Sequence, residues 1–166
     1  ARQAGLLLRG GGHRMAAGFS ISIEKIDVFQ EFFNRRIADN IANANLVPNL
    51  YFDGAVSAAG TNIELIEALQ SLAPFGSGNA EPRFVIPSAR IRYADVVGTD
   101  HVRCTLHSAE GGEIKGISFR SLDRPLGKLL LTSGGRPMHV AGRLRSNSWL
   151  GRVSPQLFID DAAPLW

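Results

Sequence analysis

A glycine-rich segment from Arg9 to Gly18, R-G-G-G-H-R-M-A-A-G, has residue types that suit contact with a phosphate. Glycine has no Cβ and tolerates positive φ, so three glycines in a row can bring backbone N–H groups close to an anion. His13 adds a donor and, at lower pH, a charge, while Arg9 and Arg14 add fixed positive charge. We predict a phosphate-gripping loop that leads into a strand over residues 19–23. A histidine bonded to its own turn and a solvated Arg9 remain the alternatives.

A second group of residues has the types that contact nucleic acid, and it lies in the C-terminal half of the chain. The formal net charge is +3, but residues 1–80 carry six Lys/Arg against seven Asp/Glu, whereas residues 81–166 carry twelve against eight. Proteins hold single strands in basic grooves where aromatic rings stack on the bases. The basic candidates of this half also include Arg103, Lys115 and Arg120. The predicted DNA-binding residues are Arg90, Arg92, Arg143, Arg145, Trp149 and Arg152.

These residues also have a purely structural interpretation. Strand alternation places Arg143 and Arg145 on one face, and likewise Arg90 and Arg92, which is also the pattern of a solvated face. Two interleaved aromatic residues, Phe119 and Phe158, are predicted to fill the core. Trp149 falls in a predicted loop, where stacking on a base and burial in the core both remain open.

No metal centre is predicted within the chain. The chain has four histidines, which are His13, His101, His107 and His139. They are scattered over the predicted elements, and the two that share a strand, His101 and His107, have no third ligand beside them. No aspartate is close to His13 in sequence. The lone cysteine, Cys104, is predicted to be a buried thiol in a reducing cytoplasm. No apolar run approaches the roughly 20 residues of a membrane span.

Two regions of different pattern must position these residues. In the first, residues 2–9 are expected to end a helix. An amphipathic helix is predicted to begin near Glu24 and Asp27 and to run to about residue 44, before Pro48. A second helix is predicted to run to about residue 72 with Thr61 as its N-cap. From residue 83 onward, alternating apolar residues predict strands. The predicted order is strands 84–97, 101–107 and 113–119, a helix over 122–131, and strands 138–144 and 153–159. That order is typical of an OB-fold, with other small barrels left open.

A loop rich in turn-forming residues separates the two regions. The sequence P-F-G-S-G-N-A-E-P over residues 74–82 contains two prolines and two glycines, which indicates a structured loop or a linker. We predict a first domain over residues 1–73, a linker loop over 74–82 and a nucleic-acid-binding domain over 83–166.

Several of these motifs carry a resemblance to a known family. G-G-H-R-M-A-A-G over residues 11–18 resembles the motif of the DHH-associated domain, the second half of the DHH phosphoesterases. The loop F-G-S-G-N-A-E-P and the later W-L-G-R and S-P-Q-L segments resemble RecJ-like single-strand-specific exonucleases. Gly10, Ser77 and Ala80 depart from the usual residues of that family. The resemblance implies an α/β DHH-associated domain followed by an all-β OB-fold-like barrel.

The resemblance also implies an activity. It implies the C-terminal part of a single-stranded-DNA-specific 5′-to-3′ exonuclease of DNA repair and recombination. Its substrate phosphate would be contacted by Gly11, Gly12 and His13, with Arg9 as a further contact. Ala16, Ala17 and Gly18 would allow close packing there.

The resemblance places the catalytic metal outside this fragment. Mn²⁺ or Mg²⁺ would be bound by a preceding DHH domain, so the fragment is expected to be inactive alone and to hold no cofactor. The expected partners are single-stranded DNA, that DHH domain and repair proteins. Two alternatives remain: a phosphodiesterase of oligonucleotides or cyclic dinucleotides, and a non-enzymatic interaction module.

Overall fold

The structure, a computed structural model, describes residues 1–44 and 49–166. The chain divides into two compact units, Ala1–Asn49 and Leu50–Trp166. This division precedes the loop over residues 74–82, so it differs from the predicted boundary, and that loop belongs to the second unit. The predicted helix stop at Pro48 lies outside the described residues.

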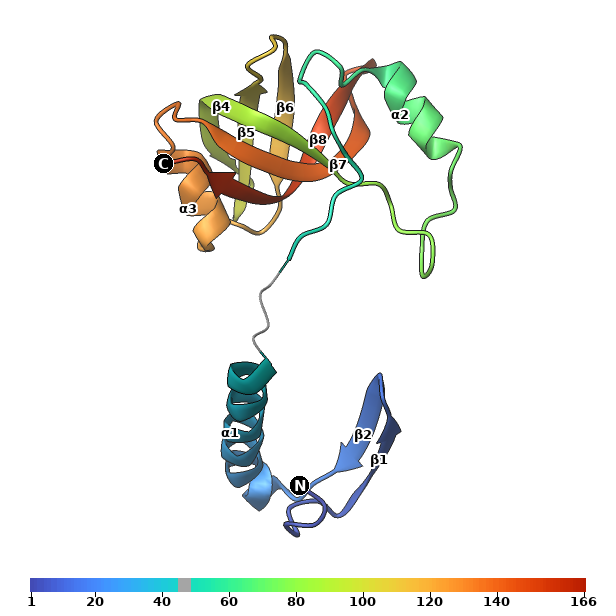
Figure 1. The fold of residues 1–166 in the computed structure, drawn as a ribbon, viewed down its shortest axis with the longest axis vertical. Coiled ribbons are helices and arrows are strands. Elements are labelled where there is room, and N and C mark those ends of the chain that lie inside the picture. Colours follow the sequence, from blue (N-terminus) through green and yellow to red (C-terminus); the bar gives the residue numbers. More distant parts are fainter. Residues whose placement is uncertain (45–48) are drawn as a thin grey trace. The chain divides into compact units, whose positions relative to one another are not determined.

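The first unit is a β-hairpin followed by a long helix (Figure 1). Strands β1 (Arg9–His13) and β2 (Ala16–Ser20) pair antiparallel, and the short 3-10 helix η1 (Ile23–Lys25) leads into α1 (Ile26–Ala44). The helix expected over residues 2–9 is wrong, because the Leu8 N–H donates to the Ser20 carbonyl at 2.9 Å. That bond holds the backbone extended beside β2, and the partner strand comes later in the sequence.

The apolar stripe of α1 meets the hairpin through aromatic rings. The ring centroids of Phe19 and Phe29 are 4.8 Å apart, and those of Phe29 and Phe33 are 5.6 Å apart. Phe19 and Phe33 nevertheless remain about half exposed, at 51% and 49%. Among residues 1–44, none whose side chain is described is buried. The stripe therefore forms a cluster but not a closed core.

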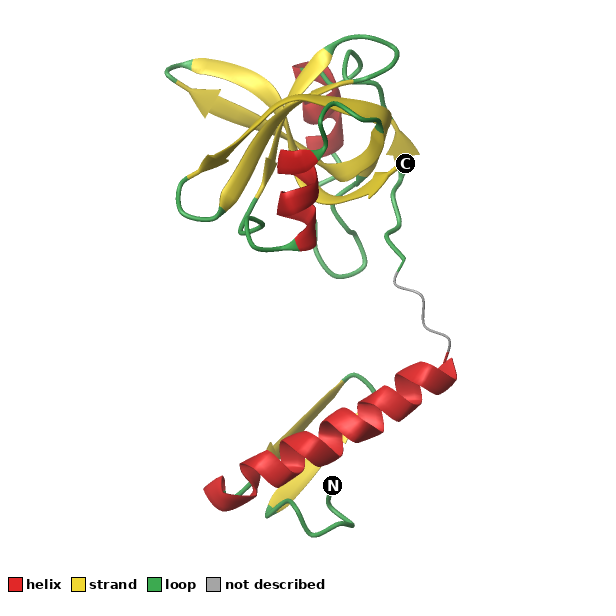
Figure 2. Ribbon diagram, turned by 90° about the vertical axis from the view of Figure 1, so that its left-hand side faces the viewer, coloured by secondary structure: helices red, strands yellow, loops and turns green. Residues whose placement is uncertain are grey.

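The second unit is a closed barrel accompanied by two short helices (Figures 1 and 2). Within the described residues its strands follow the order β3-β4-β5-β6-β8-β7, and an added pairing of β4 with β7 closes the ring. The bounds are β3 (Gly54–Ala55), α2 (Ile63–Gln70), β4 (Phe84–Val97), β5 (His101–His107), β6 (Glu113–Ser118), α3 (Pro125–Thr132), β7 (Met138–Trp149) and β8 (Arg152–Pro164).

The barrel core follows from strand alternation. On β5, Val102, Cys104 and Leu106 are fully buried, while the residues between them face outward. The predicted burial of Cys104 is confirmed, and burial raises the pKa of its thiol to about 12. The last two strands, β7 and β8, are longer than predicted. Their polar ends show little alternation of apolar and polar residues, which hides them from sequence analysis, but the two strands pair along the whole hairpin.

The helix α2 begins one residue later than predicted. Asn62 is its N-cap, and the Asn62 side chain accepts a hydrogen bond from the Leu65 N–H at 2.8 Å. Thr61 is instead buried and donates its hydroxyl to the Ala58 carbonyl at 2.6 Å. After this helix, the Asn79 side chain donates to the Leu72 carbonyl at 2.9 Å, which holds the loop over residues 74–82 in shape.

Candidate nucleic-acid interface

The predicted phosphate loop is a β-hairpin in the structure. Gly11 pairs with Gly18 and Gly12 pairs with Ala17, so these glycines are extended strand residues. His13 ends β1, and its Nδ1 accepts a hydrogen bond from the Met15 N–H at 3.3 Å. A histidine bonded to its own turn is the alternative to phosphate contact given in the sequence analysis, and this hydrogen bond agrees with that alternative. The imidazole is exposed, which keeps it accessible to an anion.

The glycines of this hairpin differ in the space around them. A methyl group added at Gly12 would lie 2.6 Å from the Cα of Ala17, whereas nothing lies within 4 Å of one added at Gly11 or Gly18. Glycine is therefore required at Gly12 by the close approach of the two strands. Over Gly11 and Gly18 the hairpin instead presents open, side-chain-free backbone.

Four of the six predicted DNA-binding residues share the outer face of the β7–β8 hairpin. Arg143, Arg145 and Trp149 alternate with the buried Leu144, and the register places Arg152 directly opposite Trp149. Directly opposed residues of paired strands point to the same side of a sheet. The barrel thus groups these basic and aromatic side chains on one surface.

The other two predicted residues, Arg90 and Arg92, lie on β4 and are exposed. Their expected common face is disturbed by a register shift between Ile91 and Tyr93, where Arg92 is the extra residue. A bulge of this kind breaks strand alternation. The guanidinium of Arg90 also donates to the Gly135 carbonyl at 2.8 Å.

Arg143 is held by a carboxylate that the sequence analysis did not connect to it. Its Nη2 lies 2.6 Å from one oxygen of Asp160, and its Nε donates to the other at 3.1 Å. Arg83 donates to the same carboxylate at 2.8 Å. Burial acts to raise the pKa of Asp160, but these hydrogen bonds outweigh it, and the net pKa is lowered.

Arg145 forms a similar pair with Glu81 of the loop over residues 74–82. Its Nε and Nη2 donate to the two oxygens of Glu81 at 2.8 and 2.6 Å, and its guanidinium lies 5.0 Å from the centroid of the Phe158 ring. The hydrogen bonds from Arg145 lower the pKa of Glu81. This bidentate pair ties the loop to β7 and offsets the charge of Arg145.

Two cations of the same surface have no ion pair among the residues that the structure describes. Lys115 on β6 and Arg152 on β8 are exposed, and each lies more than 4.0 Å from every described carboxylate. Lys115 and Arg145 are both opposite Gln156 in register, so they share the outer face. Of the four cations Lys115, Arg143, Arg145 and Arg152, Lys115 and Arg152 are thus the two without a described carboxylate partner.

The prediction that Phe119 and Phe158 fill the core is wrong. Phe119 is 47% exposed, and its ring packs edge-on against Phe158, with centroids 5.3 Å apart. The residue before it, Ser118, takes the inward position at the end of β6. Two aromatic rings therefore lie on the barrel surface beside Arg143 and Arg145, a combination of aromatic and basic groups that suits nucleobases.

Two of the three remaining histidines lie beside acids on the barrel, and the third, His139, accepts a hydrogen bond at its Nδ1 from the Ser88 N–H at 3.3 Å. His101 lies 2.8 Å from Asp100, and His107 lies 3.2 Å from Glu113. Within residues 1–44 and 49–166, no three side chains of His, Cys, Asp or Glu converge as a metal site would require. In the same part of the chain, no helix has the length and apolar character needed to cross a bilayer.

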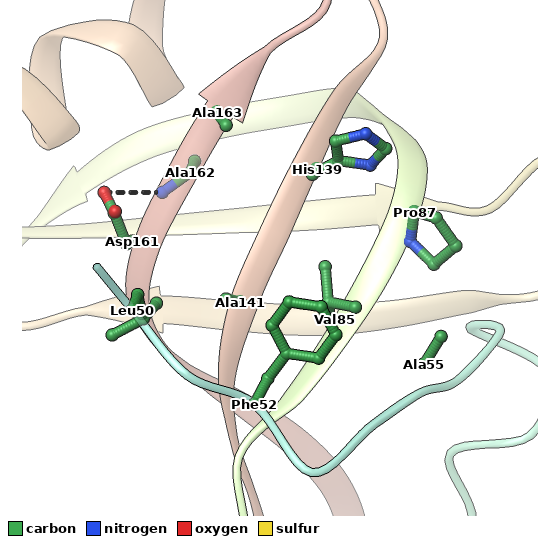
Figure 3. A pocket seen from close by; sticks show the side chains of 10 residues that line it. All are labelled: Leu50, Phe52, Ala55, Val85, Pro87, His139, Ala141, Asp161, Ala162 and Ala163. Atoms are coloured by element: carbon green, nitrogen blue, oxygen red, sulfur yellow. Dashed lines mark hydrogen bonds between the residues drawn. The ribbon is translucent and has the colours of Figure 1, made fainter.

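An apolar cavity of about 400 Å³ lies elsewhere on the second unit (Figure 3). Val85 of β4 and Ala141 of β7 line it, and Leu50 and Phe52, from the segment that leads into β3, line it as well. Polar side chains in this lining set come only from His139 and Asp161. None of the predicted DNA-binding residues lines this cavity.

Sequence reasoning did not identify Glu81 and Asp160 as members of the interface. The pairing of Glu81 with Arg145 spans 64 residues, and composition carries no signal for a contact at such separation. Lys115 belongs to the wider basic set of the sequence analysis, and it alternates with the buried Ile114 and Gly116 on a strand next to β8. The register places it on the face of Arg145.

Comparisons with known proteins agree with this architecture. A family model described as the RecJ OB domain matches residues 52–161. The single-stranded-DNA-specific exonuclease RecJ of Salmonella typhimurium is 31% identical over 163 residues, covering 96% of this chain and 27% of the relative. The corresponding protein of Escherichia coli is 30% identical over 162 residues, covering 97% and 27%.

A solved structure shows the same fold. The crystal structure of RecJ from Thermus thermophilus in complex with Mn²⁺ matches with a TM-score of 0.64 at 24% identity, over 99% of this chain and 23% of that chain. The chain thus spans about a quarter of the length of the relatives it matches. Since the family model covers more than half of the chain, from Phe52 to Asp161 within β8, the chain belongs to the RecJ OB domain family.

Proposed function

We propose that this chain is part of a single-stranded-DNA-specific exonuclease that acts 5′ to 3′ in DNA repair and recombination. Within it, the barrel holds the single strand without reading its sequence. The names of the relatives support the substrate class. Contacts to phosphates and base faces, rather than base edges, account for binding that is independent of sequence.

One observation carries the proposal: an exposed tryptophan and unpaired cations share a face of the barrel among the described residues. Trp149 is 72% exposed and lies directly opposite Arg152. OB-folds bind oligonucleotides on the face of their second and third strands and the loop between the fourth and fifth. In this barrel those positions correspond to β5, β6 and the turn between β7 and β8, which together present Lys115, Phe119 and Trp149.

The first unit has a separate role in the proposal. We assign it to the DHH-associated domain, where Arg9, Gly11, Gly12 and His13 grip a substrate phosphate. The open backbone at Gly11 and the exposed imidazole of His13 support this assignment. Ala16, Ala17 and Gly18 form the facing strand.

Divalent metal ions are bound elsewhere in the proposed protein. The solved relatives are complexes with Mg²⁺ or Mn²⁺, but the described residues of this chain do not form a metal-ligand cluster. We therefore propose that a DHH domain of the same longer protein supplies the metal, and that repair proteins are further partners.

Charge variants test the DNA-binding proposal. Removing one phosphate contact reduces the slope of log affinity against log salt by about 0.7 for single strands. We expect this reduction for Lys115→Ala and for Arg152→Ala, measured by fluorescence anisotropy with a labelled single-stranded oligonucleotide. Lys128→Ala is the matched control, because Lys128 is also an exposed lysine but lies on α3. Equal slopes in all variants would contradict the proposed face.

A second function is favoured by the apolar cavity. An interaction module that recruits a repair protein would use the cavity around Phe52 and Val85 rather than the basic face. In that case Phe52→Asp would abolish capture of a repair protein, and Trp149→Ala would leave DNA affinity unchanged. The remaining alternative is a phosphodiesterase of oligonucleotides or cyclic dinucleotides. Hydrolysis of long and short substrates by the longer protein would distinguish this activity from that of an exonuclease.

A further inference from the structure

The turn between β7 and β8 exposes apolar side chains at its tip. Trp149 is 72% exposed, Leu150 is 87% exposed and Val153 is 56% exposed. Val153 pairs with Ser148 and therefore points to the opposite side of the hairpin from Trp149, so Trp149 and Leu150 are the neighbouring apolar side chains of the tip. The flanking Ser148 and Arg152 are polar, so this apolar pair is confined to the tip.

The backbone at this tip adds a second observation. Leu150 has φ +48° and Gly151 has φ +76°. Two-residue hairpin turns with positive φ at both central positions strongly prefer Asn-Gly or Asp-Gly, because a bulky side chain is strained in that region. The chain places leucine where asparagine would lower the strain, and the leucine side chain gains no burial in return. Strained positions of this kind cluster at sites of function.

The charge around the tip indicates the chemistry of its partner. Arg152 lies directly opposite Trp149, on the same side of the hairpin, and has no ion pair among the described residues. An unpaired nucleotide offers two base faces and a phosphate. The aromatic ring and the aliphatic side chain of the tip suit the base faces, and the free guanidinium suits the phosphate. Bases within a duplex are already stacked and paired, so they expose these faces only at the free-energy cost of unstacking.

We propose that Trp149 and Leu150 form an apolar wedge that inserts between neighbouring unpaired bases, with Arg152 on the adjacent phosphate. This inference rests on the proposed single-strand binding and adds a specific way of selecting single strands. Trp149 stacks on one base, and Leu150 separates that base from the next. A duplex is disfavoured because the wedge would have to unstack paired bases.

The decisive variant is Leu150→Asn in the 166-residue chain. Asparagine removes the apolar wedge but adopts positive φ more readily than leucine, so the thermal unfolding midpoint is expected to stay the same or to rise. Affinity for a single-stranded oligonucleotide is expected to fall by at least about fivefold. For a strand of equal length made entirely of abasic sites, the change is expected to stay below about twofold, since only the bases contact Leu150.

The tryptophan provides a direct probe. In a Trp166→Phe background Trp149 is the remaining tryptophan, and its fluorescence is expected to be quenched by the normal strand and not by the abasic strand. Leu165→Asn is the matched control, because it replaces another exposed leucine, 47% exposed, near the C-terminus. It is expected to leave both affinities unchanged.

The outcomes separate the inference from the proposed function. If the unaltered chain binds the normal strand and Leu150→Asn binds it equally well, the wedge is wrong while single-strand binding stands, and the tip is free for a protein partner. If Leu150→Asn weakens binding to both strands equally, the tip acts on the backbone and the wedge is again overturned. If the unaltered chain binds neither strand, the proposed function fails as well.

Discussion

At the scale of single residues, Trp149 is the side chain on which the proposed interface depends most. It is large, 72% exposed and lies on the face that carries Lys115 and Arg152. Stacking of one base on an aromatic ring contributes ~1–3 kcal/mol. We therefore expect Trp149→Ala to weaken binding of a single-stranded oligonucleotide by about 5- to 150-fold, measured by anisotropy.

A matched control for that variant is available in the same unit. Trp166 is 48% exposed and stacks against Arg136 with 4.2 Å between the guanidinium carbon and the ring centroid. Trp166→Ala is expected to leave DNA affinity unchanged. Similar losses in both variants would mean that the effect of Trp149→Ala is not specific to the proposed face.

The carboxylates of Glu81 and Asp160 predict how stability depends on pH. The pKa of each is lowered in the folded chain, from ordinary values of 4.5 and 3.8. A lowered carboxyl pKa stabilises the folded state above the unfolded pKa, and this stabilisation is lost as pH falls through the folded pKa. The free energy of unfolding in urea is thus expected to decrease below about pH 4.5.

The variant Glu81→Gln with Asp160→Asn isolates this effect. Neither replacement titrates, so the decrease in unfolding free energy between about pH 5 and about pH 3 is expected to be smaller than in the unaltered chain. An unchanged decrease would show that other carboxylates govern the acid sensitivity. It would also argue against the ion pairs of Arg143 and Arg145 as contributors to stability.

At the scale of elements, the β1–β2 hairpin depends on one glycine more than on its neighbours. An added methyl at Gly12 would collide with Ala17, whereas Gly11 has open space. Overpacking of this kind costs about 1–3 kcal/mol. Gly12→Ala is expected to remove the hydrogen-exchange protection of the hairpin amides, and Gly11→Ala to retain it. Equal protection in the two variants would contradict the close approach of the strands.

The elements of the barrel could largely be predicted from the sequence. Alternation of buried and exposed residues marks β5 directly, and a long bent strand over 84–97 is confirmed as β4. In the first unit the amphipathic helix that ends near residue 44 is confirmed as α1. The strand β1 could not be predicted, because Arg9 to His13 becomes a strand only through pairing with β2. Three consecutive glycines carry no hydrophobic pattern that would indicate a strand.

The interface could be predicted only in part. Alternation correctly grouped Arg143 with Arg145. The predicted loop position of Trp149 is wrong, because Trp149 is the last residue of β7, but its side chain is 72% exposed. The ion pairs with Asp160 and Glu81 depend on how the barrel closes, which no local pattern encodes. The positive φ at Leu150 could not be predicted either, because leucine is not a residue that indicates such a turn.

At the scale of the whole molecule, the two units differ in how much apolar surface they bury. The second unit contains the buried core around Leu106, Met138 and Leu157, whereas the described side chains of residues 1–44 are all at least partly exposed. A folded domain needs enough burial to offset the loss of chain entropy. Residues 50–166 alone are therefore expected to unfold cooperatively in urea.

The complementary fragment gives the opposite expectation. Residues 1–49 alone are expected to show no cooperative unfolding by circular dichroism, because the aromatic cluster of Phe19, Phe29 and Phe33 does not form a closed core. A sharp transition in this fragment would contradict the account of the first unit. A gradual transition in residues 50–166 would contradict that of the barrel.

The most direct test of the central claim is binding of the 166-residue chain to a single-stranded oligonucleotide and to the matching duplex over a salt series. The account predicts preferential single-strand binding whose log affinity falls linearly with log salt, with a slope of about −0.7 for each phosphate contacted. Lys115 and Arg152 alone therefore predict a slope of about −1.4 or steeper. Equal affinity for both forms, or single-strand binding that does not change with salt, would contradict a barrel that holds single strands by unpaired cations and base stacking.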